Sequence, residues 1–337
     1  MANRNLEILK GLTFGRVWNI FLLKTSFYIS RLFKKPIHWG TPIAISIEPT
    51  TACNLKCTEC PSGLRQFTRP TGNLKADLNA KILKNLGSNL QYINYYFQGE
   101  PFINPNFLDF VKQARAKNVY VLTSTNAHFI SKKTAFSIID SGLSELIISI
   151  DGTTQKTYSN YRVEGELKTV LDGLKNISEA RIERNSKFPI VTLQYLVTKQ
   201  NEHQIDEVKA IKKLYGADNL NLKTIQVYNY KTGNPLLPEN EKYSRYKKLK
   251  NGTFKLKNKM NNHCWRLWST CVFTWDGIIV PCCFDKDAQY QMGSLTKVGF
   301  REVWKSSLYS DFRKKVLKNR QSIDICSNCS EGSKIWI

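Results

Sequence analysis

The sequence is poor in acidic residues and contains no long hydrophobic run. Its 27 Asp and Glu residues face 50 Lys and Arg residues, which gives a formal net charge of +23 at pH 7. Such an excess favours anionic partners: nucleic acid, anionic lipid or an acidic substrate. The lysines are spread along the whole chain rather than gathered in one arm. A general role in solubility therefore accounts for the charge equally well.

A secretory signal is also absent, because no small-residue cleavage site follows an apolar segment near the N-terminus. The chain contains neither tandem repeats nor low-complexity tracts. Its nine cysteines are an odd number, which a set of disulfides does not use up. We therefore expect a cytoplasmic protein whose reduced thiols serve as metal ligands.

Residues 16–35, "RVWNIFLLKTSFYISRLFKK", predict an amphipathic helix. The segment is too short and too charged to span a bilayer, since it includes Lys24 and Arg31. Two interpretations remain open: a helix packed on the body of the protein, or a peripheral helix lying on anionic lipid. Its apolar side chains fall near one stripe: Trp18, Phe21, Leu22, Tyr28, Ile29, Leu32 and Phe33.

Six apolar segments alternate with helical patterns after residue 41, which predicts a parallel sheet built from βα repeats. Ligands of such sheets bind at the carboxyl ends of the strands. Only about 40 residues precede the first strand, so we expect no independent peptide-recognition domain ahead of it. The expected strands are 44–50, 92–99, 119–125, 145–151, 190–197 and 219–227.

The chain divides into four expected regions. Residues 1–41 form a helical, amphipathic segment, 42–230 the βα unit, 231–263 a connector with one short helix, and 264–337 a second unit rich in cysteine. In the second unit, Asp276-Gly277 predicts a hairpin turn, and residues 300–319 predict an amphipathic helix.

Three cysteines follow the first expected strand: Cys53, Cys57 and Cys60. Structural zinc takes four protein ligands, and a [4Fe–4S] cluster normally takes four cysteines. Three thiolates so close together therefore indicate a metal centre with one coordination position left open. This CxxxCxxC spacing, placed directly after a strand, resembles the radical S-adenosylmethionine (radical SAM) superfamily. In that family the open iron of a [4Fe–4S] cluster binds the amino and carboxylate groups of SAM.

Further segments at the ends of successive strands strengthen the resemblance. "QGEP" (98–101) is similar to the family's Gly-Gly-Glu motif, with Gln98 in place of the first Gly. The resemblance implies that Gly99 and its neighbours contact the SAM amino group, and that Arg162 pairs with the SAM carboxylate. The resemblance implies these SAM-binding candidates: Gln98, Gly99, Glu100, Pro101, Ser124, Asn126, Ser149, Asp151, Arg162 and Gln194.

The C-terminal cysteines resemble the SPASM extension of radical SAM enzymes, which carries auxiliary [4Fe–4S] clusters. The resemblance implies one such cluster here, with four ligands: Cys264, Cys282, Cys326 and Cys329. Adjacent side chains of a strand point to opposite faces, so one of Cys282 and Cys283 is expected to ligate and the other to pack, and which does which stays open. Cys271 is expected to be a small buried hydrophobe. A zinc ribbon is the alternative, because four cysteines also suit tetrahedral zinc.

Together these resemblances imply an α/β enzyme: a partial (β/α)6 TIM-like barrel with a small C-terminal hairpin and helix iron–sulfur domain. Its cofactors would be two [4Fe–4S] clusters and SAM, reduced by an external flavodoxin- or ferredoxin-type donor. SAM cleavage would give a 5′-deoxyadenosyl radical that takes hydrogen from a peptide or protein, with net oxidation through the auxiliary cluster.

Three alternatives stay open at this stage. The substrate could be a sugar, an aminocyclitol or a lipid-linked glycan. The chain could be an iron–sulfur electron carrier. It could also be a zinc-dependent nucleic-acid-binding protein, although the motifs at the strand ends give no reason to expect specific nucleic-acid binding.

Overall fold

The computed structural model describes residues 2–332. Its main feature is a parallel sheet whose six barrel strands lie side by side in chain order. Because neighbouring strands are consecutive, the arrangement is that of a β/α barrel rather than a doubly wound sheet. The sheet does not close, and β6 forms one edge, which confirms the predicted partial barrel. The strands are β1 (Ala44–Ile47), β2 (Tyr92–Asn94), β3 (Tyr120–Thr125), β4 (Glu145–Ser149), β5 (Ile190–Val197) and β6 (Asn219–Thr224).

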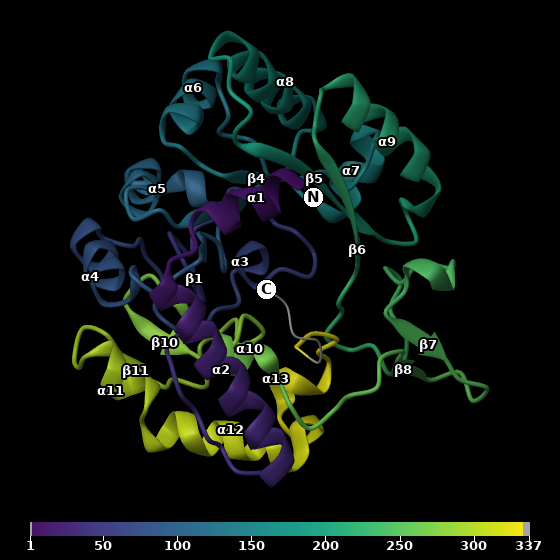
Figure 1. Ribbon diagram of the computed structural model, residues 1–337. Helices are drawn as coiled ribbons and strands as arrows, with labels where there is room; N and C mark the ends of the chain where they lie inside the picture. The colour runs from purple at the N-terminus through teal and green to yellow at the C-terminus, as the bar shows by residue number, and fades with distance from the viewer. Residues whose placement is uncertain (1, 333–337) are drawn as a thin grey trace.

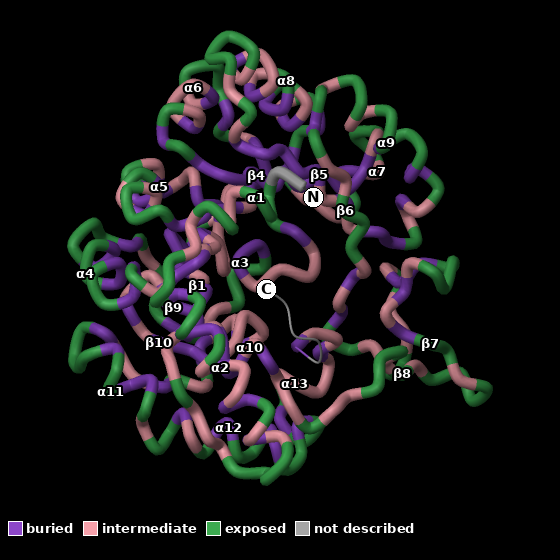
Figure 2. The backbone as a smooth tube through the Cα atoms, viewed as in Figure 1, coloured by how far each residue is buried: buried purple, intermediate pink, exposed green. Residues whose placement is uncertain are grey.

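Helices connect these strands along the outside of the sheet (Figure 1). In α8, apolar residues recur every three to four positions and are buried, as in Val170, Leu174 and Ile177. Figure 2 shows buried backbone along the sheet and exposed turns on the outer sides of α4 and α5. The connecting helices are α3 (Pro61–Leu64), α4 (Ala76–Leu86), α5 (Phe107–Arg115), α6 (Lys132–Asp140), α7 (Gln155–Tyr161), α8 (Leu167–Glu183) and α9 (Ile205–Leu214), with single 3-10 turns at Pro101–Ile103 and Glu202–Gln204.

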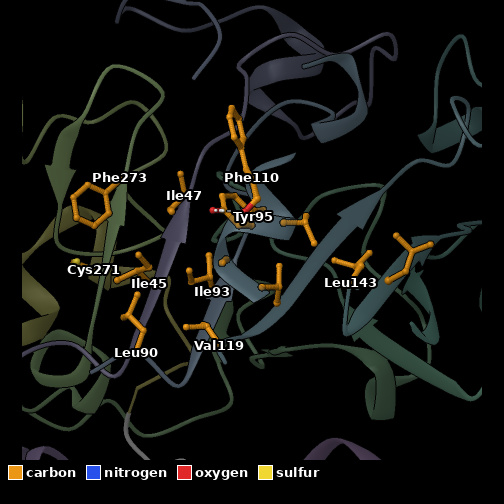
Figure 3. Packing of buried hydrophobic residues seen from close by; sticks show 14 of the residues in the cluster. Ile45, Ile47, Leu90, Ile93, Tyr95, Phe110, Val119, Leu143, Cys271 and Phe273 are labelled. Atoms are coloured by element: carbon orange, nitrogen blue, oxygen red, sulfur yellow. Dashed lines mark hydrogen bonds between the residues drawn. The ribbon is translucent and has the colours of Figure 1, made fainter. Parts of the chain in front are cut away.

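The C-terminal unit joins its strands to the same sheet. β9 (Thr270–Phe273) pairs in parallel with β1, and the antiparallel strands β10 (Ile278–Val280) and β11 (Gly293–Ser294) follow it. The predicted hairpin between β9 and β10 is confirmed, and Gly277 supplies its positive φ of 83°. Figure 3 shows Cys271 and Phe273 of β9 beside Ile45 and Ile47 of β1. Cys271 is therefore a buried core residue, as predicted.

Two segments differ from their sequence patterns. The connector holds a two-stranded ribbon, β7 (Tyr246–Lys248) with β8 (Phe254–Leu256), after a 3-10 turn at Glu241–Tyr243. Residues 300–319 form two helices instead of one, α11 (Phe300–Trp304) and α12 (Ser307–Asn319). The break comes at Ser306, whose hydroxyl accepts the Tyr309 N–H at 3.2 Å and begins a new helix. The unit also contains α10 (Trp265–Ser269), a 3-10 turn at Arg320–Ser322 and α13 (Asp324–Ser327).

The N-terminal segment forms α1 (Ala2–Lys10) and α2 (Phe14–Phe33). α2 packs on the body of the protein through Ile20, Leu23 and Phe27, and the Phe27 ring lies 5.4 Å from that of Trp265. The predicted apolar stripe does not make this contact, because most of its side chains point outward. Among residues 2–332, no helix is both long and apolar enough to cross a bilayer.

Candidate active site and a second cysteine cluster

The cysteine loop leaves the carboxyl end of β1 and is held by backbone contacts. Lys56 N–H donates to the Val163 carbonyl at 3.0 Å, and Thr58 N–H to the Tyr161 carbonyl at 3.3 Å. Both acceptors lie at or just after the end of α7, which follows β4. Cys57 is buried, and Cys60 occupies the position just before α3, where Pro61 begins the helix. The loop is thus fixed across the carboxyl ends of the strands.

The three predicted cysteines line one cavity of about 120 Å³ at these strand ends. The same cavity receives most of the side chains predicted from the strand-end motifs. It is lined by Cys53, Cys57, Cys60, Gly99, Glu100, Ser124, Asn126, Ser149 and Arg162. Four predicted residues do not line it: Gln98, Pro101, Asp151 and Gln194.

Gly99 brings the backbone of the loop that follows β2 close to the cysteine loop. Its φ is +73°, and a Cβ at this position would lie 2.3 Å from the Thr50 carbonyl oxygen. Its N–H donates to Ser62 Oγ at 2.9 Å, and Ser62 Oγ also donates to Gln98 Oε1 at 3.3 Å. Only glycine combines this conformation with this close approach. Gln98 therefore lies one contact away from the cavity.

Glu100 connects the loop that follows β2 to the end of β3 through hydrogen bonds. Its buried carboxylate accepts hydrogen bonds from Thr125 Oγ1 at 2.7 Å and from Asn126 N–H at 2.8 Å. Burial raises the pKa of Glu100 to about 7, although these hydrogen bonds work in the opposite direction. Through these hydrogen bonds Glu100 holds the polar cavity wall in place.

Arg162 is the cationic side chain of the cavity. Its Nε donates to Asp151 Oδ2 at 2.6 Å, and its Nη1 lies 3.6 Å from Cys57 Sγ. Asp151 is buried and also accepts the Leu196 N–H at 2.7 Å. Asp151 therefore holds the Arg162 guanidinium on the side away from the cavity. Its own carboxylate does not line the cavity.

Asn126 closes the cavity over the first cysteine. Its Nδ2 donates to Asn54 Oδ1 at 2.7 Å and lies 3.9 Å from Cys53 Sγ. Its Oδ1 accepts the His128 N–H at 3.1 Å. Gln194 stands apart: it pairs with Ser149 in the register of β4 and β5 but does not line the cavity.

The donor set fits a [4Fe–4S] cluster with one open iron. Three thiols line the cavity with no fourth cysteine, and each thiolate of such a cluster binds its own iron. Among residues 2–332, no three His, Cys, Asp or Glu side chains converge as ligands of a single metal ion. Burial raises the pKa of Cys53 to about 12, so ligation by iron would release its proton.

The second group of cysteines lies within the C-terminal unit. The four cysteines predicted to hold an auxiliary cluster, Cys264, Cys282, Cys326 and Cys329, line one small pocket, and Cys283 does not. Arg320 Nη2 donates to Cys329 Sγ at 3.2 Å, and Glu331 N–H to the same sulfur at 3.3 Å.

The pocket fits a cysteine-ligated group. At Gly332 (φ +80°) a Cβ would lie 2.5 Å from Cys264 Sγ, so the chain passes the thiol without a side chain. Cys283 instead packs with Val272, Val280 and Phe97. Cys282 and Cys283 both follow the end of β10 at Val280, where the chain turns, so strand alternation does not set their directions. Their thiols contact each other, and Arg266 Nη1 donates to Cys283 Sγ at 3.8 Å.

Several cavity residues were missed by sequence reasoning: Ser62, Gly63, Tyr96, Phe97 and Thr125. For Tyr96 the signal was present. Tyr95 and Tyr96 follow β2, where successive side chains point to opposite faces. Tyr95 enters the core and bonds Asn79 at 2.7 Å, so Tyr96 points into the cavity. Ser62 carried no such signal, because its contact with the Gly99 N–H depends on how the cysteine loop and the loop after β2 fold against each other.

Comparison with known proteins identifies two family models in the chain. Residues 47–210 match the radical SAM superfamily, and residues 264–330 match SPASM, an iron–sulfur cluster-binding domain. Together the two models match more than half of the chain.

Two of the curated relatives each match about half of the chain. The mycofactocin maturase MftC of Mycolicibacterium smegmatis is 29% identical over 182 residues, which is 52% of this chain and 43% of the maturase. The PqqA peptide cyclase of Rhodopseudomonas palustris is 25% identical over 193 residues, 57% of this chain and 49% of the cyclase. The chain thus spans about half the length of these curated relatives.

A solved structure shares the fold. SuiB of Streptococcus suis, bound to S-adenosylmethionine, has a TM-score of 0.61 at 17% identity over 86% of this chain and 72% of SuiB. SuiB has also been solved with its precursor peptide SuiA, with a TM-score of 0.59 at 17% identity over 85% of this chain and 70% of SuiB. At this identity the likeness concerns the fold.

Proposed function

Since the chain belongs to the radical SAM superfamily and carries a SPASM domain, it is a radical SAM enzyme, and we propose that it oxidises a peptide or protein side chain. One observation carries the proposal: a single cavity gathers the CxxxCxxC thiols with Gly99, Glu100 and Arg162 at the carboxyl ends of the strands. The relatives named as a maturase and a peptide cyclase support a peptide as the substrate class.

Bound cofactors would supply the reactive chemistry: one electron for cleaving SAM to methionine and a 5′-deoxyadenosyl radical, and an acceptor for the electron that the substrate loses after hydrogen abstraction. We propose two [4Fe–4S] clusters, held by Cys53, Cys57 and Cys60, and by Cys264, Cys282, Cys326 and Cys329. An external flavodoxin- or ferredoxin-type donor would provide the first electron. Nine free thiols suit such a cofactor set in a reducing, cytoplasmic setting.

The protein's own residues would bind and orient SAM. Arg162 is held by Asp151 at 2.6 Å and presents its remaining nitrogens to the cavity, where a carboxylate can accept a charge-assisted hydrogen bond. The Glu100 carboxylate fixes Thr125 and Asn126, so that the polar wall of the cavity is preformed. Ser124 and Ser149 offer hydroxyls on the same wall.

Aromatic side chains would protect the reaction from water. Tyr96 and Phe97 line the cavity beside the cysteine loop. Their rings would exclude water from this side of the cavity. We therefore propose that the substrate carbon is held between this aromatic wall and the SAM site.

The test is anaerobic reconstitution of the full chain, followed by iron analysis and a dithionite-driven assay for 5′-deoxyadenosine. We expect about eight irons per chain and 5′-deoxyadenosine release. A panel of short peptides and a panel of sugars and aminocyclitols are then compared. A peptide that raises the release rate and loses 2 Da supports the proposal. Stimulation by sugars alone overturns the peptide assignment, and no 5′-deoxyadenosine at all overturns the SAM chemistry.

A further inference from the structure

The outward side of α2 is an apolar surface that the proposed reaction does not use. Ten of the 18 exposed large hydrophobic side chains among residues 2–332 lie between Leu6 and Trp39. For those of them that lie in α2, the exposed fraction ranges from 50% at Val17 to 87% at Phe14. We call the following six residues the outer face: Phe14, Val17, Trp18, Phe21, Tyr28 and Leu32. Their spacings of one, three, four and seven residues place them on one side of the helix.

The inward side of α2 is unusually polar, and this fixes the orientation of the helix. Buried Arg16 donates to the carbonyl oxygens of Gly87, Ser88, Lys117 and Asn118 at 2.9–3.3 Å. A helix that covers a soluble protein normally turns its polar side to water. In this protein the four hydrogen bonds of the buried Arg16 guanidinium keep the polar side of α2 against the body of the protein. The outer face must therefore point away from the protein.

Two more polar side chains act in the same way. Asn19 Nδ2 donates to the Thr41 carbonyl at 2.8 Å, and Asn19 Oδ1 accepts the Thr41 N–H at 2.8 Å. Buried Ser30 Oγ donates to the Ile37 carbonyl at 2.6 Å. Rotating α2 to bury its apolar side would break all of these bonds and leave polar groups without partners.

The segment that carries the outer face has charge of one sign only. No Asp or Glu occurs between Glu7 and Glu48, whereas this interval holds Lys10, Arg16, Lys24, Arg31, Lys34 and Lys35. Lys34 and Lys35 are exposed at the end of the helix. The Arg31 guanidinium lies 5.7 Å from the ring centroid of Tyr28, so its charge sits at the border of the apolar surface.

We propose that α2 docks on the surface of an anionic lipid bilayer, with its axis in the membrane plane and its outer face in the acyl boundary. Aromatic and aliphatic side chains flanked by lysine and arginine are the composition of interfacial helices. A 20-residue helix offers about 30 Å of such surface. A second copy of the chain is a poor occupant, because a symmetric contact would bring the same cations together without acidic partners.

The docked orientation follows from where α2 is anchored. The carbonyls that Arg16 contacts lie in the segments just before β2 and β3, at the amino ends of the parallel strands. The cysteine cavity lies at the carboxyl ends. A six-residue strand such as β3 separates these ends by about 20 Å. In Figure 1, α1 lies across the sheet near β4, and α2 continues from it toward α10 and α12. The active site of the docked enzyme therefore opens toward water.

A consequence for the substrate rests on the proposed function. If the active-site cavity opens away from the bilayer, its substrate arrives from the aqueous side. This suits a soluble peptide better than a lipid-linked glycan in the same membrane. The contact with lipid itself does not depend on the reaction, so the two are tested by separate measurements.

The test is flotation of the reconstituted full chain with vesicles of phosphatidylcholine alone or with 30% phosphatidylglycerol. We expect binding to the anionic vesicles that weakens as salt rises. The variant F14S/W18S/F21S should lose at least tenfold in vesicle affinity. K34E/K35E should lose at least fivefold per lysine, since each cation near an anionic surface contributes about 1 kcal/mol.

The matched control is I182S/L214S, which removes two side chains exposed by 79% and 77% elsewhere on the protein. It should bind vesicles like the wild type. All variants should keep wild-type circular dichroism and dithionite-driven SAM cleavage, which separates loss of docking from loss of fold or function.

Hydrogen exchange on vesicles checks the orientation. Protection of residues 14–35 without protection of residues 50–65 supports the proposal. Protection of the cysteine loop instead overturns the orientation. Failure of the wild type to float overturns the lipid contact. A wild-type dimer in sedimentation that F14S/W18S/F21S converts to monomer, without vesicle binding, assigns the outer face to self-association instead.

Discussion

Arg162 Nε and Asp151 Oδ2 lie 2.6 Å apart, and the same guanidinium reaches Cys57 Sγ at 3.6 Å. The pair links the end of β4 to the cysteine loop. Removing one member of such a buried pair leaves the other unpaired. The Arg162→Ala variant should therefore lose about 3–5 kcal/mol of stability and bind SAM about 10- to 100-fold more weakly.

A double-mutant cycle separates these two effects. Asp151→Asn keeps the guanidinium and should weaken SAM binding less than Arg162→Ala does. The double variant should recover part of the stability, because no buried charge is left unpaired. Urea unfolding and calorimetric SAM titration provide the measurements. Equal SAM affinity in the wild type and Arg162→Ala would remove Arg162 from the SAM site.

Single cysteine variants distinguish the two clusters. Cys57→Ala should lose about four irons per chain and all SAM cleavage, while the C-terminal cluster stays. Cys329→Ala should lose about four irons but retain SAM cleavage, and it should fail to form product if the second cluster accepts the substrate electron. Iron analysis and 5′-deoxyadenosine release measure both. Full product turnover by Cys329→Ala would exclude the acceptor role.

Two further cysteines are the matched controls for iron loss. Cys271→Ala removes a thiol buried in the core, and Cys283→Ala removes one that packs with Val272 and Val280. Both should keep the full iron content. Loss of iron from Cys283→Ala together with retention in Cys282→Ala would reverse the assignment within the pair.

Gly99→Ala should disrupt the cavity by steric conflict. The added Cβ would lie 2.3 Å from the Thr50 carbonyl oxygen, at a φ of +73°. We expect a loss of about 2–5 kcal/mol of stability, the sum of backbone strain and overpacking, together with loss of SAM cleavage. Thermal unfolding and the 5′-deoxyadenosine assay give the two readouts.

Gly252→Ala isolates the contribution of the backbone angle. Its φ is +81°, and nothing lies within 4 Å of a Cβ there. It should lose only about 1–2 kcal/mol and retain activity. If both variants behave alike, the close approach of Gly99 to Thr50 does not matter for the site.

Stability should depend on pH through Glu100. Its folded pKa of about 7 exceeds the usual value of 4.5 because the carboxyl is buried. Folding therefore favours the protonated form. The contribution of Glu100 is complete below about pH 4.5 and is lost as pH rises through 7, by about 3 kcal/mol. Urea unfolding of the cluster-free protein from pH 5 to pH 8 should show a shallower decline for Glu100→Gln. Parallel curves would show that Glu100 does not titrate in this range.

The spacing of the motifs allowed much of the site to be predicted. Cys53, Cys57 and Cys60 share a cavity with Gly99, Glu100 and Arg162, because the carboxyl ends of parallel strands meet at one edge of the sheet. Asp151 was predicted to face SAM or the substrate. It lies behind Arg162 instead, and no sequence pattern distinguishes a side chain that lines a cavity from one that supports its neighbour.

The sequence by itself determined the alternation of strands and helices, the hairpin at Gly277 and the two sets of cysteines, because each depends on residues that are close along the chain. The tertiary structure decided two other features: the pairing of β9 with β1 and the outward direction of the apolar side of α2. The physical reason is the same for both. Helical and strand periodicity define the faces of an element, but contacts between residues far apart in the chain, such as those of Arg16 with Lys117 and Asn118, determine which face is buried.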